Sequence, residues 1–151
     1  MAEKDTKRRH IAKRRAARKL ALIAIYQWQM TGNGYTDIYA GIHEDKELVQ
    51  DFLKSDAAFF QSLTKYVLEN VEKVDEQLKP FLDREADQLD QIERAVLRMA
   101  TAELLNHPET PYKVVVNESV NLSKKFGADK AHKFVNGVLD KVAGVVREGE
   151  K

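Results

Sequence analysis

Residues 90–104 read DQIERAVLRMATAEL, and this stretch indicates the fold class of the chain. Asp90 and Glu93 have the spacing of a capping box, in which two side chains satisfy the free N–H groups of a helix start. Apolar residues then recur at intervals of three and four, which is typical of one face of an α-helix. They are Ile92, Val96, Met99, Ala100 and Leu104. We therefore expect a helix whose apolar face is buried.

Apolar residues recur with the same helical spacing in the part of the chain that precedes this helix. A first helix is predicted from Ala12 to Met30, before the breaker cluster Thr31-Gly32-Asn33-Gly34. Short helices are expected near residues 35–39 and 46–53. Ser55 is predicted to cap a long helix that Pro80 ends. The apolar seam of that helix is Phe60, Leu63, Val67, Val71, Val74 and Leu78.

Two further helices are predicted toward the C-terminus, after a turn bracketed by Pro108 and Pro111. The first ends at Gly127, where a left-handed C-cap is expected. Its apolar stripe is Val115, Ser119, Leu122 and Phe126. Asp129 is expected to cap the last helix. The inner face of that helix is Phe134, Val138, Val142 and either Val145 or Val146.

The sequence as a whole predicts an all-α protein of about seven helices in two packed helical subdomains around one core. Residues 1–11 form a basic N-terminal arm, residues 12–147 a single helical domain and residues 148–151 a disordered tail. The 151 residues include no cysteine, which excludes disulfides, thiolate zinc sites and cysteine nucleophiles. No apolar run is long enough for a signal peptide or a membrane span, so a cytoplasmic location is expected.

Charge is divided unevenly along the chain. Residues 1–19 hold nine Lys/Arg against Glu3 and Asp5, a net charge of +7, whereas the other 132 residues hold 16 Lys/Arg against 22 Asp/Glu, a net −6. A basic arm on an acidic body is typical of a protein that binds a polyanion, most simply nucleic acid. A solvated disordered leader and an arm folded against the acidic body are the alternatives.

On the predicted first helix, three arginines share a face with a tyrosine. With Arg14 at 0°, Arg18 lies at ~40°, Arg15 at ~100° and Tyr26 at ~120°. Guanidinium groups bind phosphates, and an aromatic ring can stack on an unpaired base. Tyr26 is equally compatible with a role at the edge of the core.

A second basic cluster is predicted at the turn between the last two helices. It comprises Lys124, Lys125, Lys130 and Lys133 beside Gly127, with Phe134 in the first helical turn. The start of a helix attracts anions, although Asp129 competes for its N–H groups. Phe126 is expected in the core. Phe134 is expected there too, unless partial exposure lets it stack on a base. Solvated lysines at a helix corner are the alternative.

No motif of an enzyme is found in the sequence. There is no glycine-rich phosphate loop, nucleophile elbow or metal-binding helix motif. The four histidines are scattered, and the pair Asp83 and Asp87 is typical of an exposed helix face. We therefore expect no catalysis, no cofactor and no metal ion.

Several segments resemble the NusB family of bacterial transcription antitermination factors, in order from about residue 12 to 147. The opening helix matches with RRAAR (14–18) and AIYQWQ (24–29), and the middle helix with IERAVLRMA (92–100). The closing helices match with PYKVVVNESV (111–120), FGA (126–128) and KFVNGVLD (133–140). The last of these is the most specific.

The resemblance implies an RNA-binding protein of two helical subdomains. Such a protein binds single-stranded boxA RNA as a heterodimer with the ribosomal protein NusE. With NusA and NusG on RNA polymerase, it suppresses Rho-dependent termination, notably in ribosomal RNA operons. By position, Arg14, Arg15, Arg18, Tyr26 and the corner from Gly127 to Phe134 match RNA-binding parts. Glu93 matches an acidic residue that faces NusE, which is basic.

Two departures from the family accompany this resemblance. The basic stretch before Arg14 is longer than expected and includes Glu3 and Asp5, and Lys130 stands where relatives can have an acidic residue. An RNA-targeting module of a ribosomal RNA methyltransferase and a protein-only interaction module are the alternative functions. The sequence leaves open whether the free protein is a monomer or a homodimer that hides the RNA surface.

Overall fold

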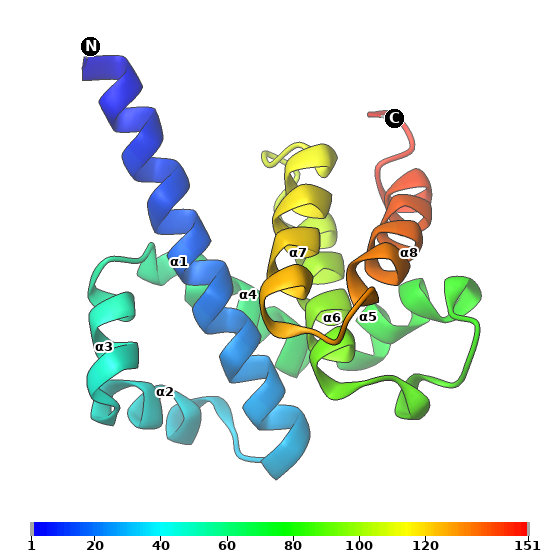
Figure 1. The fold of residues 1–151 in the computed structure, drawn as a ribbon, viewed down its shortest axis with the longest axis horizontal. Coiled ribbons are helices and arrows are strands. Elements are labelled where there is room, and N and C mark those ends of the chain that lie inside the picture. Colours follow the sequence, from blue (N-terminus) through cyan, green and yellow to red (C-terminus); the bar gives the residue numbers. More distant parts are fainter. Residues whose placement is uncertain (1, 151) are drawn as a thin grey trace. The chain divides into compact units, whose positions relative to one another are not determined.

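A computed structural model describes residues 2–150 (Figure 1), and every regular element in that range is helical. The predicted all-α class is thereby confirmed. The α-helices are α1 (Ala2–Thr31), α2 (Tyr35–Glu44), α3 (Lys46–Leu53), α4 (Ala57–Glu69), α5 (Val71–Leu78), α6 (Gln91–Asn106), α7 (Tyr112–Phe126) and α8 (Ala131–Val146). Two short 3₁₀ helices lie between α5 and α6, at Lys79–Phe81 and Ala86–Gln88.

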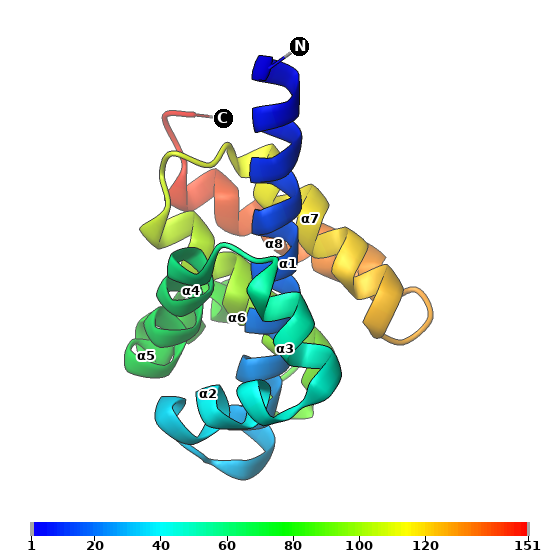
Figure 2. The same ribbon diagram turned by 90° about the vertical axis from the view of Figure 1, so that its left-hand side faces the viewer.

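The chain forms two compact units, Met1–Leu68 and Glu69–Lys151, here called the first and the second unit. In the first unit, α1 packs against α2 and α3 (Figure 2). Lys19 on α1 forms an ion pair with Asp51 on α3, with 2.9 Å between Nζ and Oδ2. Buried α1 side chains such as Leu20 and Ile25 form part of the apolar core.

Aromatic rings hold α2, α3 and α4 together within the first unit. Phe52 lies edge-on to Phe60, with ring centres 5.8 Å apart, and edge-on to Tyr39 at 5.6 Å. His43 lies against both Tyr39 and Phe52. Edge-to-face pairs of this kind add stability beyond the apolar area that they bury. The helices from residue 35 to 60 therefore share an aromatic core.

In the second unit, α6 is the central helix and packs against α5, α7 and α8. The Asp90 carboxylate accepts hydrogen bonds from the backbone N–H groups of Ile92 and Glu93, at 3.1 and 3.2 Å. Asp90 is thus the N-cap, as predicted. Every residue from 95 to 104 is buried, because three neighbouring helices cover α6 on several sides.

Arg147 fixes the end of α8 to the loop between α6 and α7. Its guanidinium donates to the carbonyl oxygens of Leu104, His107 and Thr110 at 2.9–3.0 Å, and its side chain is buried. The Glu150 carboxylate accepts from the Tyr112 N–H at 2.8 Å, which lowers the pKa of Glu150. Residues 148–150, expected to be a disordered tail, form turns; Lys151 lies outside the described residues.

The predicted long helix from Ser55 to Pro80 is wrong in two respects. Asp56, not Ser55, caps the helix, since its Oδ1 accepts from the Phe59 N–H at 3.0 Å. The helix is also broken at Asn70, whose backbone leaves the helical region at φ −130° and ψ 32°. The apolar period continues through the break, and for that reason the sequence pattern alone conceals it.

The first helix begins ten residues earlier than predicted, at Ala2 instead of Ala12. The described part of the basic arm is therefore helical; Met1 lies outside the described residues. Within residues 2–150, no helix combines the length and apolar character that crossing a bilayer requires.

Candidate nucleic-acid interface

Arg14 is held against the start of α4 within the first unit. Its Nε donates to Oδ2 of Asp56 at 3.2 Å, and its guanidinium carbon lies 3.9 Å from the centre of the Phe59 ring. The Asp56 N–H also donates to the carbonyl oxygen of Lys13 at 3.1 Å. One half-buried arginine is thus oriented by a carboxylate and an aromatic ring, which leaves it a partly accessible cation.

The other predicted residues of α1 differ in exposure. Arg15 is exposed and Tyr26 is half-buried. Arg18 is only 4% exposed, with its guanidinium carbon 5.1 Å from the Phe59 ring centre. Arg18, on the predicted basic face of the helix, is thus buried, because α1 is packed on more than one side at this level. Its long side chain contributes to packing as well as charge.

The predicted left-handed cap at Gly127 is also wrong. Gly127 has φ −87° and ψ 176°, an extended conformation open to any residue. A β-carbon at this position would lie only 2.7 Å from the carbonyl oxygen of Ser123. Glycine is therefore required by close approach to the last turn of α7, not by a positive φ.

The left-handed residue of the turn is Lys130, with φ 66°. It immediately precedes α8 and makes no side-chain cap. Asp129, the predicted cap, is exposed and accepts no hydrogen bond from the helix start in the described structure. The expected competition between Asp129 and an anion for these N–H groups is absent from this arrangement.

Four exposed lysines surround this turn, here called the α7–α8 corner: Lys124, Lys125, Lys130 and Lys133. The corner lies at the tip of two neighbouring helices (Figure 2). Lys125 lies 5.5 Å from the ring centre of Phe126. For the other three, no ion pair occurs within residues 2–150. Their charge is thus available to an anion in solution.

The two phenylalanines of the corner are less buried than expected. Phe126 is 37% exposed, so its predicted core position is wrong, and Phe134 is half-buried. On the inner face of α8, Val138 and Val142 are buried as predicted, whereas Val135 and Leu139 are buried in addition and Val145 is exposed. Arg84 lies over the Phe134 ring, with its guanidinium carbon 5.0 Å from the ring centre. This contact could not be predicted from residue spacing, because fifty residues separate the pair.

Glu93 lies in the first turn of α6, in the second unit. Burial raises the pKa of Glu93, and the nearby Asp90 carboxylate raises it further, while Arg84 acts in the opposite direction. The structure thus keeps a half-buried carboxylate beside other acidic groups. Such a group is costly for the fold, and perturbed carboxylates of this kind are often functional.

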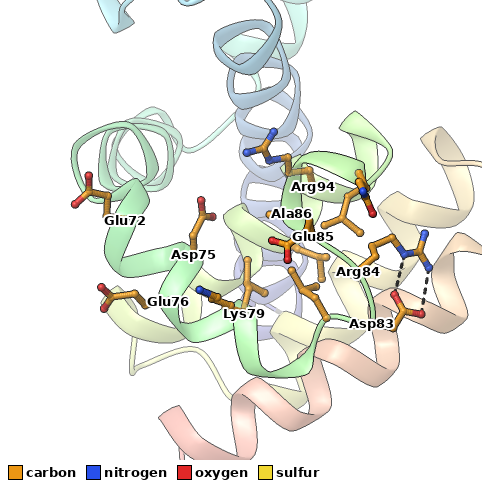
Figure 3. Close-up of a pocket in the computed structure, with 14 residues that line it drawn as sticks. Glu72, Asp75, Glu76, Lys79, Asp83, Arg84, Glu85, Ala86 and Arg94 are labelled. Carbon is orange, nitrogen blue, oxygen red and sulfur yellow. Dashed lines mark hydrogen bonds and ion pairs between the residues drawn. The ribbon is translucent and has the colours of Figure 1, made fainter.

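A groove of about 820 Å³ lies close to this region of the second unit (Figure 3). Arg84 and Asp83 form an ion pair at one side of it, with 2.8 Å between Nε and Oδ1. Its charged lining is mostly acidic: Glu72, Asp75, Glu76, Asp83 and Glu85 against Lys79, Arg84 and Arg94. An acidic groove is suited to a basic protein segment and unsuited to RNA phosphates.

Sequence comparisons identify relatives over most of the chain. The model of the NusB family matches residues 15–144. Transcription antitermination protein NusB from Idiomarina loihiensis is 47% identical, with 90% of this chain and 95% of the relative covered. The protein of the same name from Alteromonas mediterranea is 41% identical, with 93% and 98% covered.

Solved structures agree with these matches. NusB from T. maritima has a TM-score of 0.71 at 28% identity, covering 85% of this chain and 89% of that one. A chain in the crystal structure of antitermination factors NusB and NusE in complex with dsRNA has a TM-score of 0.72 at 27% identity, covering 87% and 96%. Sequence and fold together show that the chain belongs to the NusB family, a family of transcription antitermination proteins and not of enzymes.

Proposed function

We propose that this protein binds boxA RNA of nascent transcripts, notably of ribosomal RNA operons, as a heterodimer with NusE, and suppresses Rho-dependent termination. The observation that carries the proposal is the similarity, at a TM-score of 0.72, to a chain solved together with NusE and dsRNA. Recognition of a single strand is the part of the proposal that comes from the family resemblance. The curated relatives, named as transcription antitermination proteins, support the same function.

On the RNA side, the exposed cations bind phosphates and the aromatic rings stack on bases. Arg15 on α1 and the lysines of the α7–α8 corner hold the strand backbone, with Arg14 and Arg18 of the same helix completing the family's basic motif. Tyr26 and Phe134 are half-buried, which leaves part of each ring available to an unpaired base. The proposal is that one RNA strand contacts both surfaces.

On the protein side, NusE binds near Glu93 and the acidic groove. The net charge of −6 outside residues 1–19 favours a basic partner, as NusE is by the family resemblance. The complex then joins NusA, NusG and RNA polymerase in the cytoplasm. A homodimer that covers the RNA surface is the proposed resting state if the free protein self-associates.

The decisive experiment is a titration of labelled boxA RNA with this protein, with and without NusE, at several salt concentrations. We expect NusE to tighten binding and scrambled bases to weaken it. About four phosphate contacts predict a slope of log affinity against log salt near −3.

Each other outcome rejects part of the proposal. Equal affinity for scrambled RNA indicates a nonspecific binder, and preference for a duplex of the same sequence excludes single-strand recognition. NusE binding without any RNA binding indicates a protein-only module.

A further inference from the structure

The first twelve described residues of α1 form a helix that nothing else in the first unit covers. Residues 2–13 are helical and exposed throughout, and α1 extends past α2, α3 and α4 of the same unit (Figure 1). The match to the family model begins at residue 15, so this segment precedes the matched range.

The cations of this segment continue the arginine face of α1. With Arg14 at 0° and ~100° per residue, Lys7 lies at ~20°, Lys4 at ~80° and Arg8 at ~120°. Arg15 lies at ~100° on this same face. We call Lys4, Lys7, Arg8, Arg14 and Arg15 the basic stripe. It spans about 16 Å along the helix axis at 1.5 Å per residue.

The two acidic residues of the segment lie at its N-terminal end, Glu3 at ~340° beside the stripe and Asp5 at ~180° away from it. Glu3 and Asp5 lie in its first turn, where the helix dipole favours negative charge. Each also stands four residues before a cation, Lys7 and Arg9, in the favourable order for a helical pair. Because α1 is packed further along, these turns extend an existing helix and need no nucleation of their own.

We propose that Lys4, Lys7 and Arg8 bind the phosphates of RNA nucleotides that flank boxA, independently of their bases. This inference rests on the proposed function and extends it. Two features favour RNA as the occupant of the stripe. The three cations lie on the same helix face as Arg14 and Arg15, and their positive charge is complementary to RNA phosphates. The stripe offers no aromatic ring for a base, and within residues 2–150 its three N-terminal cations make no ion pair.

The chain provides a matched control for the test. Arg9 and Lys13 lie at ~220° and ~260°, on the opposite side of the same exposed helix. The double variants Lys7→Ala/Arg8→Ala and Arg9→Ala/Lys13→Ala remove the same net charge from the same segment. They differ only in whether the stripe or the opposite face is changed.

The measurement compares a minimal boxA RNA with one extended by about ten unstructured nucleotides on either side. For the wild type we expect the longer RNA to bind more tightly and with a steeper salt dependence. The stripe variant should lose that gain, with the slope reduced by about 1.4 for two contacts, and the control variant should keep it.

A second pair of variants tests the helix itself. Ile11→Pro keeps every cation but breaks α1 between the two halves of the stripe, whereas Ile11→Ala keeps the helix. Ile11 is 47% exposed, so neither change removes a core side chain. We expect only the proline variant to lose the gain from flanking RNA.

The outcomes separate this inference from the proposed function. If minimal boxA RNA fails to bind, the proposed function is wrong. If it binds but flanking nucleotides add nothing, or if both double variants lose the gain equally, the stripe inference is overturned while the function stands. Tighter binding of an acidic protein to the stripe, with no effect of flanking RNA, also overturns it.

Discussion

The guanidinium carbon of Arg14 lies 3.9 Å from the ring centre of Phe59, a side chain that is 2% exposed. This pair joins α1 to α4 within the first unit. Arg14 therefore has a structural role in addition to its proposed contact with phosphate. Its effects on folding and on RNA binding have to be measured separately.

Replacing Arg14 by alanine should lower the free energy of unfolding by about 1–2 kcal/mol, because it removes the stacking on Phe59 and the ion pair with Asp56. Arg9→Ala should change it by less than about 0.5 kcal/mol, since Arg9 is exposed. Urea denaturation of the two variants provides the measurement. Equal stability of both variants would show that the Arg14 contacts contribute nothing.

Gly127→Ala should destabilise the protein by about 1–3 kcal/mol, because the new β-carbon meets the Ser123 carbonyl oxygen at 2.7 Å. The displaced corner should also bind RNA more weakly. Gly137→Ala is the control: it lies within α8 with open space around it and should stabilise by about 0.5–1 kcal/mol. Thermal unfolding distinguishes the two, and a neutral Gly127→Ala would refute the close-approach argument.

Lys130→Asp should weaken RNA binding, because it places a negative charge at the α7–α8 corner. Asp and Asn tolerate the left-handed backbone of this position, so neither substitution should unfold the turn. Lys130→Asn, which removes only the positive charge, should have a smaller effect and reduce the salt slope by about 0.7. Unchanged affinity of the aspartate variant at fixed salt would contradict a phosphate contact here.

The raised pKa of Glu93 predicts a pH-dependent contribution to stability. The folded state binds this proton more strongly than the unfolded chain, whose glutamate pKa is about 4.3. The contribution is therefore complete below that value and is lost as the pH rises through the folded pKa. Glu93→Gln should be more stable than the wild type at pH 7, with the difference disappearing near pH 4.

Affinity for NusE shows whether Glu93 contributes to partner binding or only lowers the stability of the fold. The same Glu93→Gln variant should bind NusE more weakly despite its greater stability. Urea denaturation across pH and a NusE titration at pH 7 provide the two measurements. A variant that is more stable and binds NusE normally would remove Glu93 from the proposed partner surface.

Sequence periodicity predicted the helices well and their ends less well. The Asp90 cap and the helix at residues 46–53 agree with the structure, because capping and breaker residues act locally. The break at Asn70 and the extended Gly127 were missed. At Asn70 the apolar spacing fits both a continuous and a broken helix, and at Gly127 a glycine fits both a left-handed and an extended backbone. Tertiary packing selects one conformation at each place.

Exposure of the site residues was harder to predict than their position on the helices. The lysines of the α7–α8 corner are exposed as expected, but Arg18 is buried and Phe126 is not. Burial depends on neighbours that are distant in sequence, such as Phe59 beside Arg18. Arg84 and Arg147 were missed for the same reason, since their partners lie 37 to 50 residues away.

The central claim is that one RNA strand contacts both α1 and the α7–α8 corner. Photo-crosslinking of boxA RNA in its complex with this protein and NusE tests this claim most directly. A photoreactive amino acid is placed at position 15 in one variant and at position 133 in another, and the stoichiometry is determined by mass spectrometry. The proposal predicts one RNA per protein and crosslinks from both positions to that RNA. Crosslinks from one position only, or two RNA molecules per protein, would contradict it.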